Sequence, residues 1–148
     1  MKIDDIDKMI INTILHNPRL SVRDIGKCCN VSAVTVLNRI KILEKEKIIK
    51  SYTAYIDYSK IGYDFDVAIK IRVSKGRLID VEEKIATHKN VFAVYDMTGD
   101  FDVLVIAKFK SKKNFDAFIK KIQSYPFIER TETMMILNTI KENFLDVE

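Results

Sequence analysis

Residues 21–43, SVRDIGKCCNVSAVTVLNRIKIL, decide the fold, because they form the pattern of two short helices joined by a tight turn. Gly26 falls where the two helices of such a pair approach each other closely, and a residue without a side chain permits this approach. Asn30 falls in the turn, and asparagine tolerates a left-handed backbone better than other residues that carry a side chain. This spacing is typical of a helix-turn-helix, a motif that binds DNA.

The second helix of the pair is expected to begin after Ser32, whose hydroxyl can cap an orphan backbone N–H. Val36, Ile40 and Leu43 repeat at intervals of four and three residues, which predicts one buried stripe. Residues away from this stripe are candidates for DNA contact, since Asn pairs with adenine, Arg with guanine, and Val or Thr contacts the thymine methyl group, whereas Lys41 or Arg23 is expected to meet phosphate. A solvated helix face is the alternative. The predicted DNA-facing residues are Ser21, Arg23, Ser32, Ala33, Val34, Thr35, Leu37, Asn38, Arg39 and Lys41.

The excess positive charge of the chain lies in its first third. Residues 1–50 contain ten Lys and Arg against six Asp and Glu, a net charge of +4, whereas residues 51–148 contain fifteen of each kind. A basic module joined to a neutral one indicates nucleic-acid contact in the first module and a different task in the second.

The remainder of the chain alternates between the period of a strand and that of a helix. Residues 52–58 predict a strand-like hinge. The elements expected after the hinge are a strand over 65–73, a helix over 78–85, a hairpin of strands over 91–97 and 101–109, a helix over 115–122 and a strand over 128–140. This β-α-β-β-α-β order is typical of a ferredoxin-like sandwich. One face of such a sheet lacks helices, and its apolar side chains predict a second copy of the chain as its cover, hence a homodimer.

The expected fold class is therefore α+β. A helix-turn-helix (winged-helix-like) domain is expected over residues 1–50, a hinge strand or linker over 51–62, and a ferredoxin-like βαββαβ sandwich over 63–148. The chain has no apolar run near the ~20 residues of a membrane span and no apolar block typical of a secretion signal, so we expect a cytoplasmic protein.

The sequence predicts no catalytic, metal or cofactor site. Cys28, Cys29, His16 and His88 are potential metal ligands, but their spacing matches no zinc pattern, so we expect Cys29 in the helical core and Cys28 at the surface. The chain contains neither a Gly-rich phosphate loop nor a G-x-S-x-G motif, and its paired acids have no histidine nearby in sequence. An enzyme is therefore not expected.

The chain resembles the Lrp/AsnC transcription regulators, also called feast/famine regulators, over nearly its whole length. The resemblance is carried by Asp4-Asp5-Ile6-Asp7, by SVRDIGKCCNVSAVTVLNRIKILEKEKIIKSYTAYID, by VYDMTGDFDVLVIAKF and by TETMMIL. It implies a DNA-binding N-terminal domain, a hinge strand, and a C-terminal sandwich that dimerises, assembles into tetramers or octamers, and senses an amino acid or a related metabolite. Asn30, Asn38 and Phe101 depart from the residues usual in the family, which are Gly, a basic residue and Tyr.

The resemblance also implies an effector site around the turn of the predicted hairpin. Its residues are Thr98, Gly99, Asp100 and Asp102, with further hydroxyl contacts from Thr131 and Thr133 of the same or a neighbouring subunit. Backbone N–H groups near Gly99 would hold the carboxylate of an amino acid, and the acidic side chains would hold its amine. A hairpin turn with solvated carboxylates is the alternative.

Together these features predict a sequence-specific DNA-binding regulator whose dimer presents two recognition helices to successive major grooves of a pseudo-palindrome, about 34 Å apart. The alternative is a metabolite-binding regulatory subunit of an enzyme, with the helical module used for protein contact. The basic N-terminal segment argues against this alternative.

Overall fold

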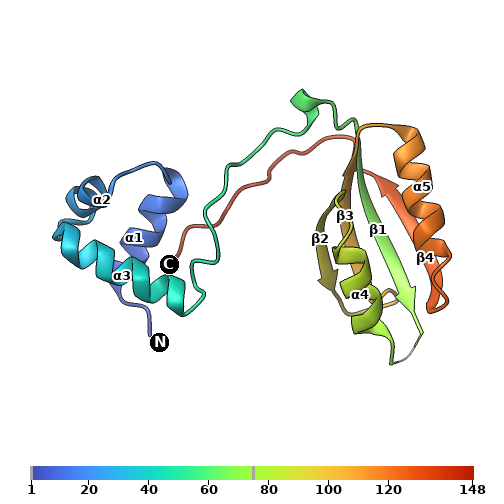
Figure 1. Ribbon diagram of the computed structural model, residues 1–148, viewed down its shortest axis with the longest axis horizontal. Helices are drawn as coiled ribbons and strands as arrows, with labels where there is room; N and C mark the ends of the chain where they lie inside the picture. The colour runs from blue at the N-terminus through green and yellow to red at the C-terminus, as the bar shows by residue number, and fades with distance from the viewer. Residues whose placement is uncertain (1, 75) are drawn as a thin grey trace. The chain divides into compact units, whose positions relative to one another are not determined.

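Capping side chains set the start of the three helices near the N-terminus. Asp4, Ser21 and Ser32 each accept a hydrogen bond from a backbone N–H three residues later, at 2.9 to 3.2 Å. Such caps satisfy donors that have no partner within the helix. The helices that follow are α1 (Asp5–His16), α2 (Val22–Cys29) and α3 (Ala33–Lys45). The computed structural model in Figure 1 describes residues 2–74 and 76–148.

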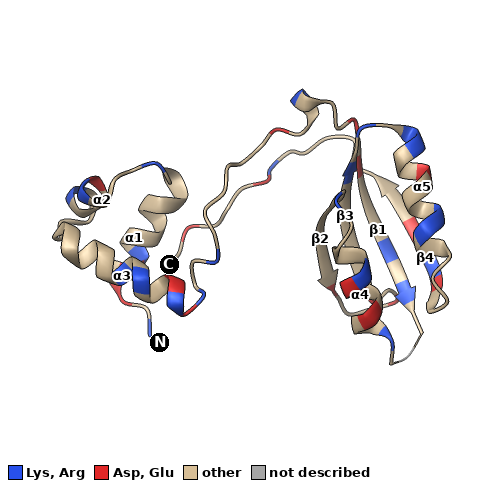
Figure 2. Ribbon diagram, in the orientation of Figure 1, with Lys and Arg blue, Asp and Glu red and all other residues tan. Residues whose placement is uncertain are grey.

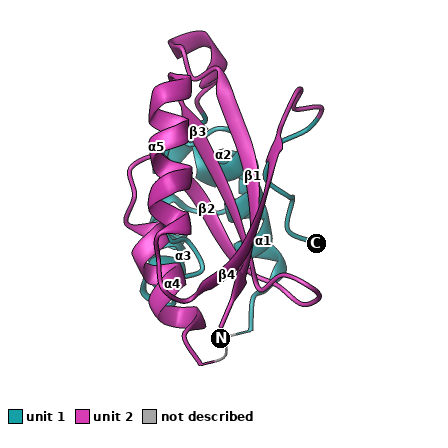
Figure 3. Cartoon of the chain, turned by 90° about the vertical axis from the view of Figure 1, so that its right-hand side faces the viewer, with its two compact units in different colours: residues 1–55, 141–148 teal, residues 56–140 magenta. Residues whose placement is uncertain are grey.

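The chain divides into two compact units, which Figure 3 distinguishes by colour. Unit 1 contains residues 1–55 and 141–148, and unit 2 contains residues 56–140. The core of unit 1 consists of side chains from all three helices: Ile10, Ile14, Ile25, Cys29 and Val36. Cys29 is buried and Cys28 is exposed, so the prediction for both thiols is confirmed.

Unit 2 is a four-stranded antiparallel sheet with the order β2-β3-β1-β4 and two helices. This topology confirms the expected ferredoxin-like sandwich. Its elements are η1 (Ser59–Ile61), β1 (Phe65–Val73), α4 (Leu78–Ala86), β2 (Val91–Asp96), β3 (Val103–Phe109), α5 (Lys112–Gln123) and β4 (Ile128–Met135).

Alternation along β1 and β3 places the core between the sheet and the two helices. Every second residue of β3 is buried, and Val105 pairs with Ile69 of β1 on the same face. Val81 and Ile85 of α4 and Phe118 and Ile122 of α5 complete this core. No helix among the described residues of unit 2 packs on the opposite face of the sheet, which presents half-buried apolar side chains, including Ala68, Leu104 and Ile106.

Three expectations differ from the structure. Residues 51–57 form neither helix nor strand, since none of the described strands pairs with them, so the predicted strand over 52–58 is wrong for the single chain. Strand β4 ends at Met135, which pairs with Val67 of β1, rather than at residue 140. Residues 141–148 group with unit 1 instead of with the sandwich.

The C-terminal tail contacts α1 inside unit 1. The side-chain amide of Asn12 donates to the carbonyl of Val147 at 3.0 Å and accepts from its N–H at 2.8 Å. His16 lies 3.0 Å from a carboxylate oxygen of Asp146. Within residues 2–74 and 76–148, no helix is long and apolar enough to cross a membrane.

Candidate DNA-binding and effector sites

The turn between α2 and α3 depends on two residues that the sequence singles out. A Cβ atom on Gly26 would lie 2.7 Å from the carbonyl oxygen of Val31, so any side chain there would force the turn away. The same turn is closed by a 2.9 Å hydrogen bond from the N–H of Val31 to the carbonyl of Gly26. Asn30 has φ 53° and ψ 43°, the predicted left-handed conformation. Both predicted roles are confirmed.

Helix α3 has one buried and one exposed side. Val36 and Leu43 are fully buried and Ile40 is half-buried, as the spacing predicts. On the opposite side Val34 is 68% exposed and Leu37 is 41% exposed. We call four of the exposed side chains of this side the α3 face: Val34, Leu37, Asn38 and Lys41. The face therefore offers apolar methyl groups, one amide and one ammonium group to a partner.

Arg39, which the sequence predicts to face DNA, is directed to another element of unit 1. Its guanidinium donates to Asp4 at 2.6 Å and to Asp7 at 3.2 Å, and Asp7 is fully buried. The backbone N–H of Asp7 and the Arg39 guanidinium hold the pKa of Asp4 below its usual value. Arg39 therefore joins α3 to the start of α1, and this ion pair competes with the base contact that the sequence predicts for it.

The remaining predicted residues surround the N-termini of α2 and α3. Ser21 and Ser32 are caps, and the hydroxyl of Thr35 lies 2.8 Å from that of Ser32. Ala33 and Thr35 are half-buried, whereas Arg23 is exposed. A shallow hollow of about 380 Å³ lies along the turn, and its lining includes Arg23, Lys27 and Ala33, the first residue of α3. Two cations and a helix N-terminus are favourable neighbours for a phosphate group.

The loop from β2 to β3 contains four of the predicted effector residues. Gly99 has φ +117°, a conformation that residues with side chains rarely adopt. Thr98, Gly99 and Asp100 are exposed. Asp102 is already engaged, since its carboxylate accepts from the N–H of Val73 at 2.8 Å and from Arg72 at 3.2 Å. Among the residues that the structure describes, the carboxylate of Asp100 has no hydrogen-bond or ion-pair partner, so the loop offers this carboxylate and its own backbone to solvent.

Arg72 is a residue of this loop region that the sequence-based prediction missed. It lies on β1 and also donates to the carbonyl of Asp100 at 3.3 Å. Its signal in the sequence is weak, because Arg72 is one of three charged residues, with Asp66 and Lys70, at the alternating positions of β1. Phe101 is buried, and two cations lie close to its ring. The ammonium group of Lys70 is 4.8 Å and the guanidinium group of Arg130 is 4.5 Å from the ring centroid.

The structure places Thr131 and Thr133 on β4. Thr131 pairs with Ile71 and Thr133 with Ile69, so both threonines share the side of the sheet that packs against the helices. The hydroxyl of Thr131 accepts from the side-chain amide of Gln123 at 3.3 Å. Across the described part of the chain, no hydrogen bond joins either threonine to the 98–102 loop. One subunit alone therefore does not bring the six predicted effector residues together.

Two family models cover most of the chain. Residues 66–145 match the Lrp/AsnC ligand binding domain, and residues 3–50 match a winged helix-turn-helix DNA-binding domain. An uncharacterized HTH-type transcriptional regulator of Pyrococcus furiosus is 39% identical over 144 residues, which cover 97% of each chain. HTH-type transcriptional regulator FL11 of Pyrococcus horikoshii is 33% identical over 140 residues, covering 95% of this chain and 93% of the relative.

Solved structures have the same arrangement of elements. AsnC of E. coli gives a TM-score of 0.89 at 23% identity, covering 99% of this chain and 100% of that chain. A transcriptional regulator of Neisseria meningitidis in complex with L-Met gives a TM-score of 0.86 at 21% identity, covering 99% of this chain and 97% of that chain. At this level of identity the similarity establishes the fold.

Proposed function

This chain belongs to the Lrp/AsnC family and is a DNA-binding transcription regulator with a ligand-binding domain, and from this premise we propose that the α3 face reads the bases of its operator. The observation that carries the proposal is the division of α3. One side is buried in the core of unit 1, and the other presents Val34, Leu37, Asn38 and Lys41. A recognition helix needs such an exposed side to enter the major groove.

The chemistry of the α3 face assigns a role to each side chain. The amide of Asn38 pairs with adenine through two hydrogen bonds, and the methyl groups of Val34 and Leu37 contact thymine methyl groups. Lys41 meets phosphate on one side of the groove. Arg23, at the hollow beside the turn, meets phosphate on the other, with Ser21, Ser32, Ala33 and Thr35 close to the backbone. These contacts position the helix and leave base readout to three side chains.

A homodimer supplies the second recognition helix. The helix-free face of the sheet offers apolar side chains that a second copy would cover, and two-fold symmetry then presents two α3 helices about 34 Å apart to a pseudo-palindrome. Assembly of dimers into tetramers or octamers would place further copies of the 98–102 loop close together. Assembly would then complete, with residues from a neighbouring subunit, the effector site that one subunit leaves incomplete around the 98–102 loop.

The proposed effector is an amino acid or a related metabolite at the 98–102 loop. Backbone N–H groups next to Gly99 fit a carboxylate, and Asp100 fits an amine, while Arg72 and Asp102 hold the loop in shape. Supporting this class of ligand, the regulator of Neisseria meningitidis was solved with L-Met. An effector that binds one assembly more tightly than another shifts the equilibrium between them.

Genomic DNA selection tests base readout by α3. Purified full-length protein, the Asn38→Ala variant and a control variant, Asn138→Ala, are each incubated with fragmented DNA at moderate salt. Asn138 is an exposed asparagine outside both proposed sites. We expect wild type and Asn138→Ala to enrich the same palindrome and Asn38→Ala to lose discrimination at one adenine in each half-site. Identical enrichment by all three proteins would refute the role of Asn38.

The effector is tested in the same selection with and without a mixture of amino acids. We expect the enriched sites or the sedimentation coefficient of the complex to change, and Asp100→Asn to abolish that change without altering the palindrome. If no amino acid alters either quantity, the proposed effector class is wrong, although base readout by α3 stands independently.

A further inference from the structure

Helix α5 of unit 2 has a concentration of positive charge that neither the base-reading face nor the effector loop accounts for. Residues 108–121 contain six lysines against one acidic residue, Asp116, although residues 51–148 as a whole are neutral. Figure 2 shows the lysines of α5 in blue at both of its ends. We call four of them the α5 lysine surface: Lys112, Lys113, Lys120 and Lys121. All four are exposed.

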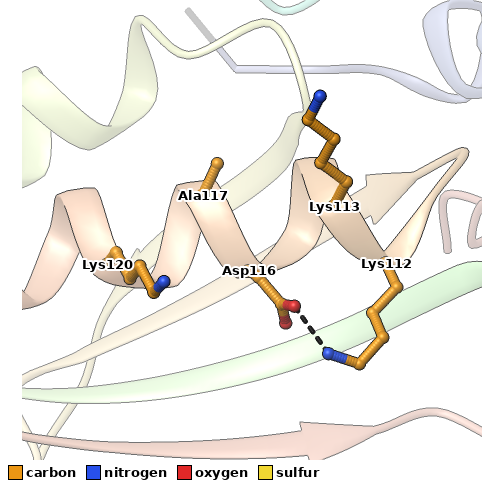
Figure 4. Close-up of a pocket in the computed structure, with 5 residues that line it drawn as sticks. All are labelled: Lys112, Lys113, Asp116, Ala117 and Lys120. Atoms are coloured by element: carbon orange, nitrogen blue, oxygen red, sulfur yellow. Dashed lines mark hydrogen bonds and ion pairs between the residues drawn. The ribbon is translucent and has the colours of Figure 1, made fainter.

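The α5 lysine surface lies on the side of the helix that faces away from the sheet. Phe118 and Ile122 are buried against the sheet, and the helical period places the lysines on the remaining half. The surface contains a shallow hollow of about 520 Å³ around the small side chain of Ala117 (Figure 4). An extended, rounded partner can therefore approach the helix between the lysines.

Only part of this charge is neutralised within the chain. Lys112 donates to Asp116 at 2.6 Å, an exposed pair one helical turn apart. Lys113 and Lys120 take part in no ion pair among residues 2–74 and 76–148. Figure 4 shows Lys112 and Lys113 leaving the first turn in different directions, with Lys120 further along the same helix. Two ammonium groups near the centre of the exposed half are thus available to an anionic partner.

Helix stability does not explain lysines at the N-terminal end of α5. The partial positive charge of a helix N-terminus favours acidic side chains in the first turn, and α1, α2 and α4 each have at least one there. Helices α3 and α5 have none. Helix α3 is the proposed base-reading helix. Both α3 and α5 therefore lack the acidic side chains in the first turn that would repel a phosphate group.

The positive charge extends beyond α5 to the adjoining loop. Burial lowers the pKa of His88, and the ammonium groups of Lys121 and Lys89 lower it further. The His88 ring lies 4.6 Å from that of Phe118, on the buried side of the helix. Lys121 of α5 and Lys89 of the segment between α4 and β2 therefore both add positive charge around His88.

We propose that the α5 lysine surface is a second, sequence-independent contact for the phosphate backbone of the DNA that the regulator binds. The proposal rests on the proposed function, since it assigns the same class of partner to another surface. Lys113 and Lys120, the two ammonium groups available to a partner, are separated by about two helical turns, ~10 Å along the axis. This length is close to the ~12 Å width of the major groove, so the lysines at the two ends can meet phosphates of opposite strands.

The test compares DNA binding on a short duplex that holds only the selected palindrome with binding on a duplex several times longer. Four full-length proteins are used: wild type, the double variant Lys113→Gln/Lys120→Gln, the charge-matched control Lys60→Gln/Lys141→Gln, and Asp116→Asn. Lys60 and Lys141 are exposed and lie outside α5. Binding constants are measured by fluorescence anisotropy over a range of salt, with circular dichroism to verify folding.

On the long duplex, the slope of log Kobs against log salt should fall in magnitude by about 0.9 for each lysine–phosphate contact removed by Lys113→Gln/Lys120→Gln. The control should retain the wild-type slope, and Asp116→Asn should bind more tightly than wild type. On the short duplex all four proteins should bind alike. An unchanged slope on the long duplex would overturn the proposal while leaving base readout intact.

Two further outcomes separate the proposal from its alternatives. If wild type fails to bind the short duplex in preference to unrelated DNA, the proposed function itself fails. If Lys113→Gln/Lys120→Gln changes the sedimentation coefficient of the free protein and leaves the slope unchanged, the surface is an interface between protein subunits, and the proposal is overturned.

Discussion

The two units of this regulator stabilise their cores by different means. Unit 2 has a cluster of twelve buried apolar residues, most of them on β1 and β3. The corresponding cluster of unit 1 has five, and beside it the carboxylate of Asp7 is fully buried with Arg39 as its partner. A small unit buries little apolar surface. Caps and ion pairs occur in both units, but the smaller apolar cluster of unit 1 makes its caps, its close backbone approach and its buried ion pair a larger share of its stability.

The largest expected effect is a cavity in the core of unit 2. Phe109→Ala removes a fully buried ring that contacts Phe115 and Phe118, and should lower the free energy of unfolding by about 3–5 kcal/mol. Urea denaturation followed by circular dichroism measures this change. Ile79→Ala, which truncates a side chain 67% exposed, is the control and should change the free energy far less. Equal effects would show that Phe109 is not part of a packed core.

A smaller effect is expected from the close approach in unit 1. Gly26→Ala places a methyl group 2.7 Å from the carbonyl oxygen of Val31 and should destabilise the protein by about 1–3 kcal/mol. The affinity for the selected palindrome should fall together with the stability, because the clash displaces α3. Asn30→Gly is the matched control in the same turn and should be neutral or slightly stabilising, since glycine adopts the left-handed conformation readily. Wild-type stability of Gly26→Ala would contradict the close approach.

The ion pair of unit 1 should affect stability without affecting base preference. Asp7→Ala removes a buried acceptor of Arg39 and of the Asp4 N–H, and should cost about 1–2 kcal/mol. Arg39→Gln should also destabilise unit 1 but should select the same palindrome as wild type in genomic DNA selection. If Arg39→Gln changes the preference for guanine at any position of the palindrome, Arg39 contacts a base, and a purely structural role for it is contradicted.

The smallest expected effect is a pH dependence in unit 2. The pKa of His88 is lowered below 6.5 in the folded chain. As the pH falls below about 6.5, the unfolded chain therefore binds more protons than the folded chain does. Stability should therefore be at its full value above pH ~6.5 and decrease below it. An NMR titration of the His88 ring measures the pKa directly, and Lys121→Gln should raise it. A wild-type pKa at or above 6.5 would contradict this account.

Local chemistry made part of this structure predictable. The roles of Gly26 and Asn30 follow from the backbone conformations that each residue permits, and the alternation of apolar residues in β1 and β3 follows from the two faces of a sheet. Cys29 of helix α2 is buried and Cys28 is exposed, as the sequence predicts. These features depend on residues close in sequence, so the sequence alone carries their signal.

Long-range contacts account for what the sequence-based prediction missed. Arg39 borders the exposed side of α3, and nothing within its own helix indicates that it pairs with Asp7, 32 residues earlier. The tail contact between Asn12 and Val147 spans 135 residues and has no local signal. Residues 51–57 have the composition of a strand, but a strand requires a neighbour to pair with, and the single chain does not provide one.

The ratio of specific to non-specific DNA affinity for Asn38→Ala tests most directly whether the α3 face reads bases. Both constants are measured at one salt concentration, with the selected palindrome and with unrelated DNA of equal length. Base readout predicts that the ratio falls by about 5- to 160-fold, corresponding to about 1–3 kcal/mol for a lost bidentate contact, while the non-specific constant stays unchanged. An unchanged ratio, or an equal loss in both constants, would contradict base readout by α3.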